Sequence, residues 1–185
     1  TSIPGMLVSG IIAVVVGGVM IVSALLGIFL FNPLEVGGCR FFMENSEYQP
    51  TVGRLGFAFQ KGMYGKTVLT LFLRKLFIGL WSLLLIVPGI VKAYEYRMVP
   101  YLLADDPNMT RQDAFRLSKE LMYGQKWNTF VLDLSFLGWS LLSLCTCGLL
   151  AIFYVNPYVQ ATNAELFLEL KREYFASRQN AYPSM

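Results

Sequence analysis

The feature that most constrains this chain is an uncharged stretch of 31 residues, Leu134–Ala164. The flanking residues continue its apolar helical pattern, so the whole segment runs over 44 residues, from Trp127 to Leu170. A single helix needs about 20 residues to cross a bilayer. The length therefore predicts two crossings, with Thr146-Cys147-Gly148 as the turn between them.

A second segment repeats this pattern. The tetrapeptide Trp-Ser-Leu-Leu begins at Trp81 and again at Trp139, and each copy leads through a glycine-containing break to an apolar run that contains proline. Lys66–Ala104 has 39 residues, which again suffices for two crossings. We expect the turn of this helical hairpin at Pro88-Gly89, because proline suits the first turn of a returning helix.

The composition agrees with a membrane protein. Hydrophobic residues make up 55% of the 185 residues, and charged residues make up 15%, against roughly 25% in a typical soluble domain. The net charge of +3 is too small to indicate a nucleic-acid partner. The chain has no histidine, and its three cysteines form neither a disulfide framework nor a metal-ligand pattern, so we expect no cofactor and no metal.

The placement of lysine and arginine predicts the orientation. With two hairpins, 13 of the 15 Lys and Arg residues lie on one side or in the helix halves next to it, and the other two, Lys92 and Arg97, lie within a helix. The positive-inside bias identifies that side as cytoplasmic. The sequence thus predicts an all-α, polytopic membrane bundle of repeated helical hairpins with a cytoplasmic C-terminus. The five expected crossings cover about residues 6–40, 67–87, 89–104, 127–146 and 149–170.

The first helix resembles one arm of a third hairpin. Its segment Gly27–Pro33 is similar to Ala151–Pro157, which lies in the second arm of a predicted hairpin, so we expect a sixth helix upstream. The whole chain, 1–185, is predicted to be one membrane domain with a cytoplasmic connector at 43–66. A cytoplasmic amphipathic helix is predicted within 105–125, where Thr110 and Asp113 form a capping box.

Six short motifs stand out together: Asn32–Gly37, Leu73–Leu84, Pro88–Tyr101, Lys126–Trp127, Leu132–Phe136 and Asn156–Tyr158. They resemble the motifs of an uncharacterised bacterial membrane family, domain of unknown function 975. The resemblance covers about Phe29 to Leu168 and implies about six helices, but no activity, substrate or catalytic residue. The chain is also distantly similar to the membrane region of some glycerophosphodiester phosphodiesterases, whose catalytic domain is a separate soluble one.

A few polar residues fall at membrane depth, where a central charge costs roughly 2.5–3.5 kcal/mol. Lys92 and Glu95 have the spacing of an internal pair, and Arg97 needs another carboxylate. The candidate polar site comprises Glu35, Lys92, Glu95, Arg97, Asp133, Asn156 and Glu165. These residues are either ion pairs that hold the helices in register or a polar site for an ion, proton or amphiphile.

The sequence favours a non-enzymatic role, because no serine or cysteine is accompanied by a base. We expect a multi-pass protein of the bacterial cytoplasmic membrane, a scaffold or interaction partner that contacts membrane lipids, a protein partner or a second copy of itself. Two alternatives stay open: a small transporter or channel subunit with a polar site around Arg97, and a lipid-interacting membrane protein or enzyme.

Overall fold

The computed structural model describes residues 3–47, 52–59, 62–145, 148 and 150–181, and the elements in these ranges are all helical. This confirms the all-α fold class. The elements are α1 (Ile3–Leu26), η1 (Gly27–Phe31), α2 (Asn32–Glu47), η2 (Val52–Phe59), α3 (Tyr64–Leu84), α4 (Ile86–Glu95), α5 (Val99–Asp105), α6 (Arg111–Leu121), α7 (Lys126–Cys145), η3 (Ala151–Val155) and α8 (Asn156–Ala181).

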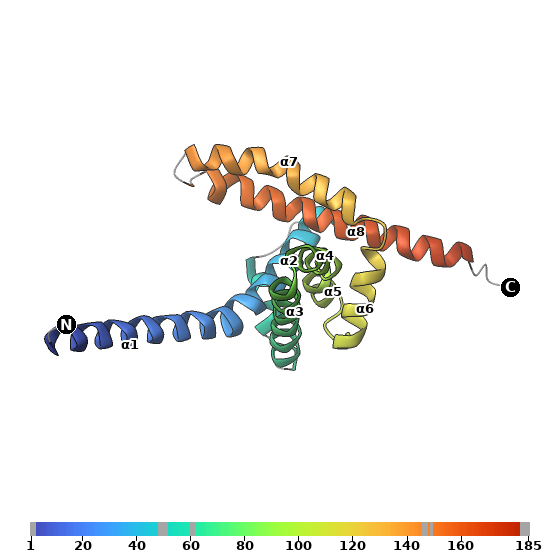
Figure 1. Ribbon diagram of the computed structural model, residues 1–185. Helices are drawn as coiled ribbons and strands as arrows, with labels where there is room; N and C mark the ends of the chain where they lie inside the picture. The colour runs from blue at the N-terminus through green and yellow to red at the C-terminus, as the bar shows by residue number, and fades with distance from the viewer. Residues whose placement is uncertain (1–2, 48–51, 60–61, 146–147, 149, 182–185) are drawn as a thin grey trace.

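Two helical segments are long and apolar enough to cross a membrane, namely Ser9–Asn45 and Tyr64–Leu84. The sequence predicts five crossings, so among the described residues the structure supports fewer spans than expected. Figure 1 shows α1 extending away from the body of the molecule, while α7 and α8 run side by side as a long hairpin. The described side chains of α1 are almost all exposed, although they are nearly all apolar.

Each Asn-Pro pair follows a π-helical turn. The turn η1 precedes Asn32-Pro33, and η3 precedes Asn156-Pro157. Proline lacks an N–H, and its ring clashes with the carbonyl four residues earlier, so a widened turn relieves the clash without ending the helix. At the first site the hydroxyl of Tyr64 donates a hydrogen bond of 2.8 Å to that carbonyl, the backbone oxygen of Phe29.

The turn of the first hairpin lies earlier than predicted. Helix α3 ends at Leu84, Leu85 is extended (φ −157°, ψ 134°), and α4 begins at Ile86. Pro88 and Gly89 therefore lie inside α4 and not in the turn. Gly89 is buried at the contact between the two helices, where an added Cβ would come within 2.6 Å of Ser82 Cα. The glycine is needed for close helix packing.

The returning arm of this hairpin is not a continuous helix. Helix α4 has 10 residues, so it is about 15 Å long, half the thickness of a bilayer core. A turn at Tyr96–Met98 separates it from α5, in which Pro100 occupies the first turn. The predicted crossing over 89–104 is thus a bent segment, and Arg97 lies in the bend instead of the middle of a helix.

The second hairpin turns near the predicted position. Thr146 and Cys147 lie outside the described residues, whereas Gly148 has a φ of +83°. A positive φ favours glycine, because a Cβ would be strained there. Its backbone N–H bonds the Ser143 carbonyl at 2.9 Å, which closes the end of α7.

The packed core lies at one end of the apolar helices. It is formed by α2, the first half of α3, α5, α6 and the middle of α8, with residues such as Leu71, Met98, Leu102, Met122 and Phe167 fully buried. The connector contributes η2, which packs on α2. Helix α6 begins with the predicted cap, in which the Asp113 N–H donates a hydrogen bond to the Thr110 hydroxyl. We call this packed region the hub.

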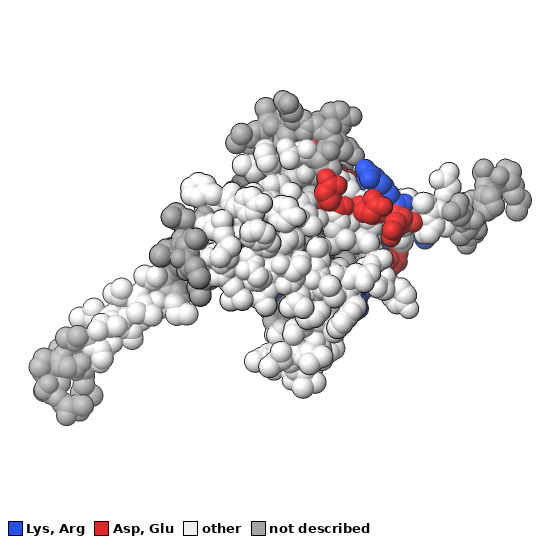
Figure 2. Space-filling view, turned by 90° about the horizontal axis from the view of Figure 1, so that it is seen from above, with Lys and Arg blue, Asp and Glu red and all other residues white. Residues whose placement is uncertain are grey.

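Charged and apolar surfaces are separated around the hub. Figure 2 shows the visible Asp, Glu, Lys and Arg side chains gathered at one edge, toward the C-terminal part of α8, and a broad uncharged surface on the side from which α1 extends. Large exposed apolar side chains cover α1, the α3–α4 turn and the α7–η3 end; examples are Val14, Leu83, Ile86, Leu141 and Phe153.

Candidate functional site

A pocket of about 450 Å³ opens where the hub meets α4 and α7, and it contains three residues of the predicted polar site, Glu35, Arg97 and Asp133. We call it the central pocket. Helices α2, α3, α4, α5, α7 and α8 all contribute to it. It is lined by Glu35, Cys39, Arg74, Ala93, Tyr94, Arg97, Pro100, Tyr101, Asp133, Gln160 and Asn163.

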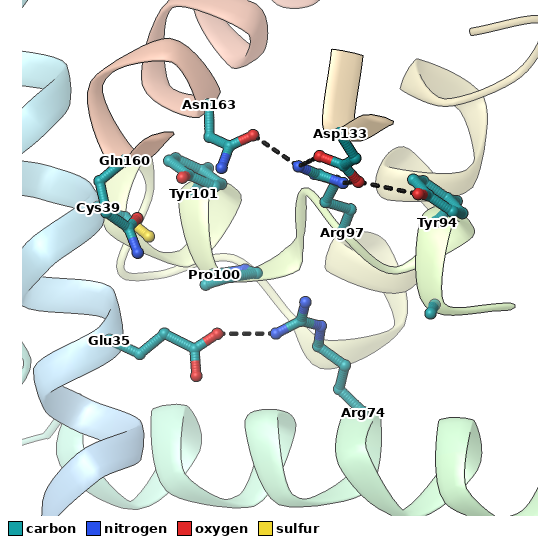
Figure 3. A pocket seen from close by; sticks show the side chains of 11 residues that line it. Glu35, Cys39, Arg74, Tyr94, Arg97, Pro100, Tyr101, Asp133, Gln160 and Asn163 are labelled. Carbon is teal, nitrogen blue, oxygen red and sulfur yellow. Dashed lines mark hydrogen bonds and ion pairs between the residues drawn. The ribbon is translucent and has the colours of Figure 1, made fainter. Parts of the chain in front are cut away.

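Arg97 is the centre of a hydrogen-bond network in this pocket (Figure 3). Its guanidinium donates to both carboxylate oxygens of Asp133, at 2.5 and 2.7 Å, and to the amide oxygen of Asn163, at 2.8 Å. The hydroxyl of Tyr94 donates to the same Asp133 carboxylate at 2.8 Å. The bend after α4 aims Arg97 at α7 and α8, so one side chain joins three parts of the chain.

Glu35 forms the second charged cluster of the central pocket. It accepts a hydrogen bond of 2.8 Å from Arg74 on α3, and its other oxygen lies 3.3 Å from the Lys75 ammonium. Lys75 also donates to the side chain of the buried Asn32, at 2.5 Å. Figure 3 shows the Glu35–Arg74 pair on the opposite wall of the pocket from Arg97 and Asp133. Asn32 and Glu35, in the first turn of α2, are thus tied to α3.

Lys92 and Glu95 form an ion pair of 2.6 Å, but neither side chain lines the central pocket. Glu95 also pairs with Lys126 at the start of α7, at 2.7 Å. Its backbone carbonyl accepts a hydrogen bond of 2.7 Å from Ser118 on α6. This third cluster therefore joins α4 to α6 and α7.

Two of the predicted site residues are placed elsewhere. Asn156 and Glu165 are exposed, and neither lines the central pocket. Both lie on α8. Glu165, two residues after Asn163, projects from roughly the opposite side of the helix, whereas Asn156 lies about two turns before Asn163 along the helix axis. The sequence interpretation assigned both by their expected depth in the membrane, which shows neither which way a helical side chain points nor how far along the helix a pocket reaches.

Arg74 and Gln160 are pocket residues that the sequence interpretation missed. Arg74 and Lys75 interrupt the apolar pattern of α3, and such an interruption is a usable signal for a polar contact within a bundle. Gln160 carried no comparable signal, because an uncharged amide on a long helix is ordinary. Its role at the pocket depends on the packing of α8 against α2 and α5.

The charges that line the central pocket balance. Two arginines, Arg74 and Arg97, face two carboxylates, Glu35 and Asp133, and both carboxylates are already engaged. Among the described residues no group of three His, Cys, Asp or Glu side chains is placed to hold a metal ion. The arrangement can hold helices together or accommodate a neutral or zwitterionic polar group, since each of its two carboxylates is paired with an arginine.

These features define an all-helical protein with two apolar helices of membrane-spanning length and a charge-balanced pocket between its helices. Residues 83–173 match the family model described as "Protein of unknown function (DUF975)", which confirms the resemblance found in the sequence. The matched region contains Arg97, Asp133 and Asn163, whereas Glu35 and Arg74 lie before its first residue. Comparison with curated proteins and with solved structures found no match.

Proposed function

We propose that this protein is a multi-pass integral protein of the bacterial cytoplasmic membrane that acts as a scaffold or interaction partner and has no enzymatic activity. The observation that carries the proposal is the division of its surface. The ends of α1, of the α3–α4 hairpin and of the α7–η3 hairpin are apolar and exposed, while the ion pairs of Glu35 and Asp133 lie in the hub or beside it. Apolar surface of this extent favours lipid or another apolar helix as its neighbour.

The ion pairs support a structural role for the hub. Each of the three clusters joins separate helices: Glu35 with α3, Asp133 with the α4–α5 bend, and Glu95 with α7. Removing one partner of such a pair leaves an unpaired charge, so these contacts specify how the helices meet. A rigid hub with apolar extensions suits a protein that presents a fixed surface to a partner in the membrane.

Membrane integration and threading are tested together by extraction and by labelling. We expect the protein to stay with the membrane in alkaline carbonate and to float with liposomes. In a variant whose native cysteines are replaced, Leu85→Cys should react with an impermeant maleimide in intact cells. Lys119→Cys, on the exposed face of α6, is the matched control and should react only after the cells are opened.

Release of the protein by carbonate would refute the membrane assignment. Protection of Leu85→Cys in intact cells would show that the α3–α4 hairpin ends within the bilayer, as the short length of α4 permits. Reaction of Lys119→Cys from outside would reverse the predicted orientation.

The central pocket favours a second candidate function, a small transporter or channel subunit. Its volume of about 450 Å³ and its balanced charges suit a small zwitterionic or neutral polar solute. The bend at Arg97 resembles the broken helices that form transport sites at membrane depth. Flux of such solutes into proteoliposomes that is abolished by Asp133→Asn in a folded protein would favour this function over a scaffold. A protein that passes no solute favours the scaffold.

A further inference from the structure

A second pocket, of about 470 Å³, lies between the first half of α3 and the start of α6, away from the central pocket. We call it the α3–α6 pocket. Its polar end is formed by Lys66, Arg111 and Gln112, and its apolar end by Leu73, Phe77 and Phe115. None of these residues belongs to the charged clusters described above.

The charge of this pocket is unbalanced. Lys66 and Arg111 are both exposed, neither forms an ion pair within the part of the chain that the structure describes, and no Asp or Glu lines the pocket. The carboxylate of the nearby Asp113 accepts hydrogen bonds from Arg116, at 2.7 Å, and from the Thr110 hydroxyl, at 2.5 Å. The pocket therefore has two cations available for an anion, unlike the central pocket, where each cation has a carboxylate.

The apolar end is built from aromatic side chains. Phe77 and Phe115 meet edge to face with ring centroids 6.0 Å apart, and Phe115 contacts Tyr96 in the same way at 5.0 Å. Phe77 is 41% exposed and Leu80, one turn further along α3, is 61% exposed, so the apolar end continues onto an open apolar face. Lys66 lies about 16 Å from Phe77 along the helix axis, at the beginning of the segment long enough to span a membrane.

From this geometry we infer that the α3–α6 pocket binds an anionic phospholipid. Lys66 and Arg111 bind the phosphate of the headgroup, and an acyl chain lies along Leu73, Phe77 and Phe115. The assignment rests on the proposed membrane location. It favours a lipid over a free phosphate, because the cations occur at the end of an apolar groove that a small soluble anion would leave empty. The positive end of α6, which begins at this pocket, adds to the attraction.

The test uses the purified full chain in detergent, titrated with phosphatidylglycerol and followed by native mass spectrometry. The variant K66Q/R111Q removes both cations of the pocket, and K119Q/R178Q is the control. Each pair changes the net charge from +3 to +1 (3 − 2 = 1), and neither control residue lines the pocket. Lipid attraction falls about fivefold for each cation lost near a membrane surface, so the pocket variant should bind roughly 30-fold more weakly.

We expect K119Q/R178Q to bind like the parent, phosphatidylcholine to bind weakly to all three proteins, and glycerol 3-phosphate not to compete. Equal weakening in the two double variants would mean that only overall charge matters and would overturn the site. Competition by glycerol 3-phosphate would assign the pocket to a soluble phosphate instead. Phe77→Ser gives an independent check, because loss of the apolar wall should weaken lipid binding while the cations stay.

The lipid site and the membrane assignment can fail separately. If the protein is extracted by carbonate, the proposed membrane function fails, whatever the titration gives. If it resists carbonate but binds phosphatidylglycerol and phosphatidylcholine alike, only the lipid site fails. Circular dichroism of each variant shows whether the helices have formed, and the exposure of Lys66 and Arg111 leads us to expect native helix content.

Discussion

Replacing Arg97 with methionine tests whether the central ion pair stabilises the hub. The change removes two hydrogen bonds to Asp133 and one to Asn163 while keeping an unbranched apolar side chain. Loss of one partner of a fully buried pair costs about 3–5 kcal/mol. Here the side chains of Arg97 and Asp133 are 18% and 32% exposed, and Asp133 keeps its bond from Tyr94, so water can partly solvate the carboxylate.

We therefore expect Arg97→Met to lower the free energy of unfolding by about 2 kcal/mol, less than the value for a buried pair. For a chain of this size that corresponds to a fall in Tm of about 4–8 °C. The assay is thermal unfolding in detergent, followed by the fluorescence of the three tryptophans. Unfolding is compared for the parent, Arg97→Met, Asp133→Asn and the double variant.

The double-mutant cycle isolates the interaction between the two side chains. We expect a coupling energy of about 1–2 kcal/mol, because the residues are in direct contact. Arg116 and Asp113 form the matched control pair, with a similar distance of 2.7 Å but side chains that are 72% and 46% exposed. Such a pair should couple by less than about 1 kcal/mol. A coupling at Arg97–Asp133 no larger than this control would refute a stabilising role for the central pair.

Two further substitutions test the helix contacts by the same unfolding assay. Gly89→Ala should lower the free energy of unfolding by about 1–3 kcal/mol, because the added Cβ would meet the Ser82 backbone. The control is Gly79→Ala on α3, whose added Cβ meets nothing within 4 Å, so this change should be neutral or stabilising. Equal effects of the two changes would contradict the close packing at Gly89. Tyr64→Phe removes the hydrogen bond to the Phe29 carbonyl and should lower the free energy of unfolding by about 1 kcal/mol. Tyr123→Phe, at an 85% exposed residue, is the control and should leave stability unchanged. Unchanged stability of Tyr64→Phe would show that the π turn needs no such support.

The local features of this fold are those that the sequence alone predicted well. Apolar segments of sufficient length and helical period predicted the helices, and the Thr110 cap and the glycine at position 148 were identified from residue type. Such features depend on neighbours a few residues away, where steric and hydrogen-bond preferences act directly. The resemblance to the DUF975 family likewise came from short motifs, and the family comparison confirmed it.

Other features depended on how the helices pack. Pro88 and Gly89 suggested a turn, but proline is also accepted within the first turn of a helix and glycine at a close contact, and the packing of α4 on α3 decided between these roles. The partner of Arg97 is 36 residues away in sequence, and that of Glu35 is 39 residues away. The expected depth of each residue in the membrane made Asp133 one of several candidate carboxylate partners for Arg97, but it could not exclude Glu165 from the polar site. Only the rotation of each helix about its axis, which the surrounding contacts set, determines which polar side chains meet in the pocket and which face outward.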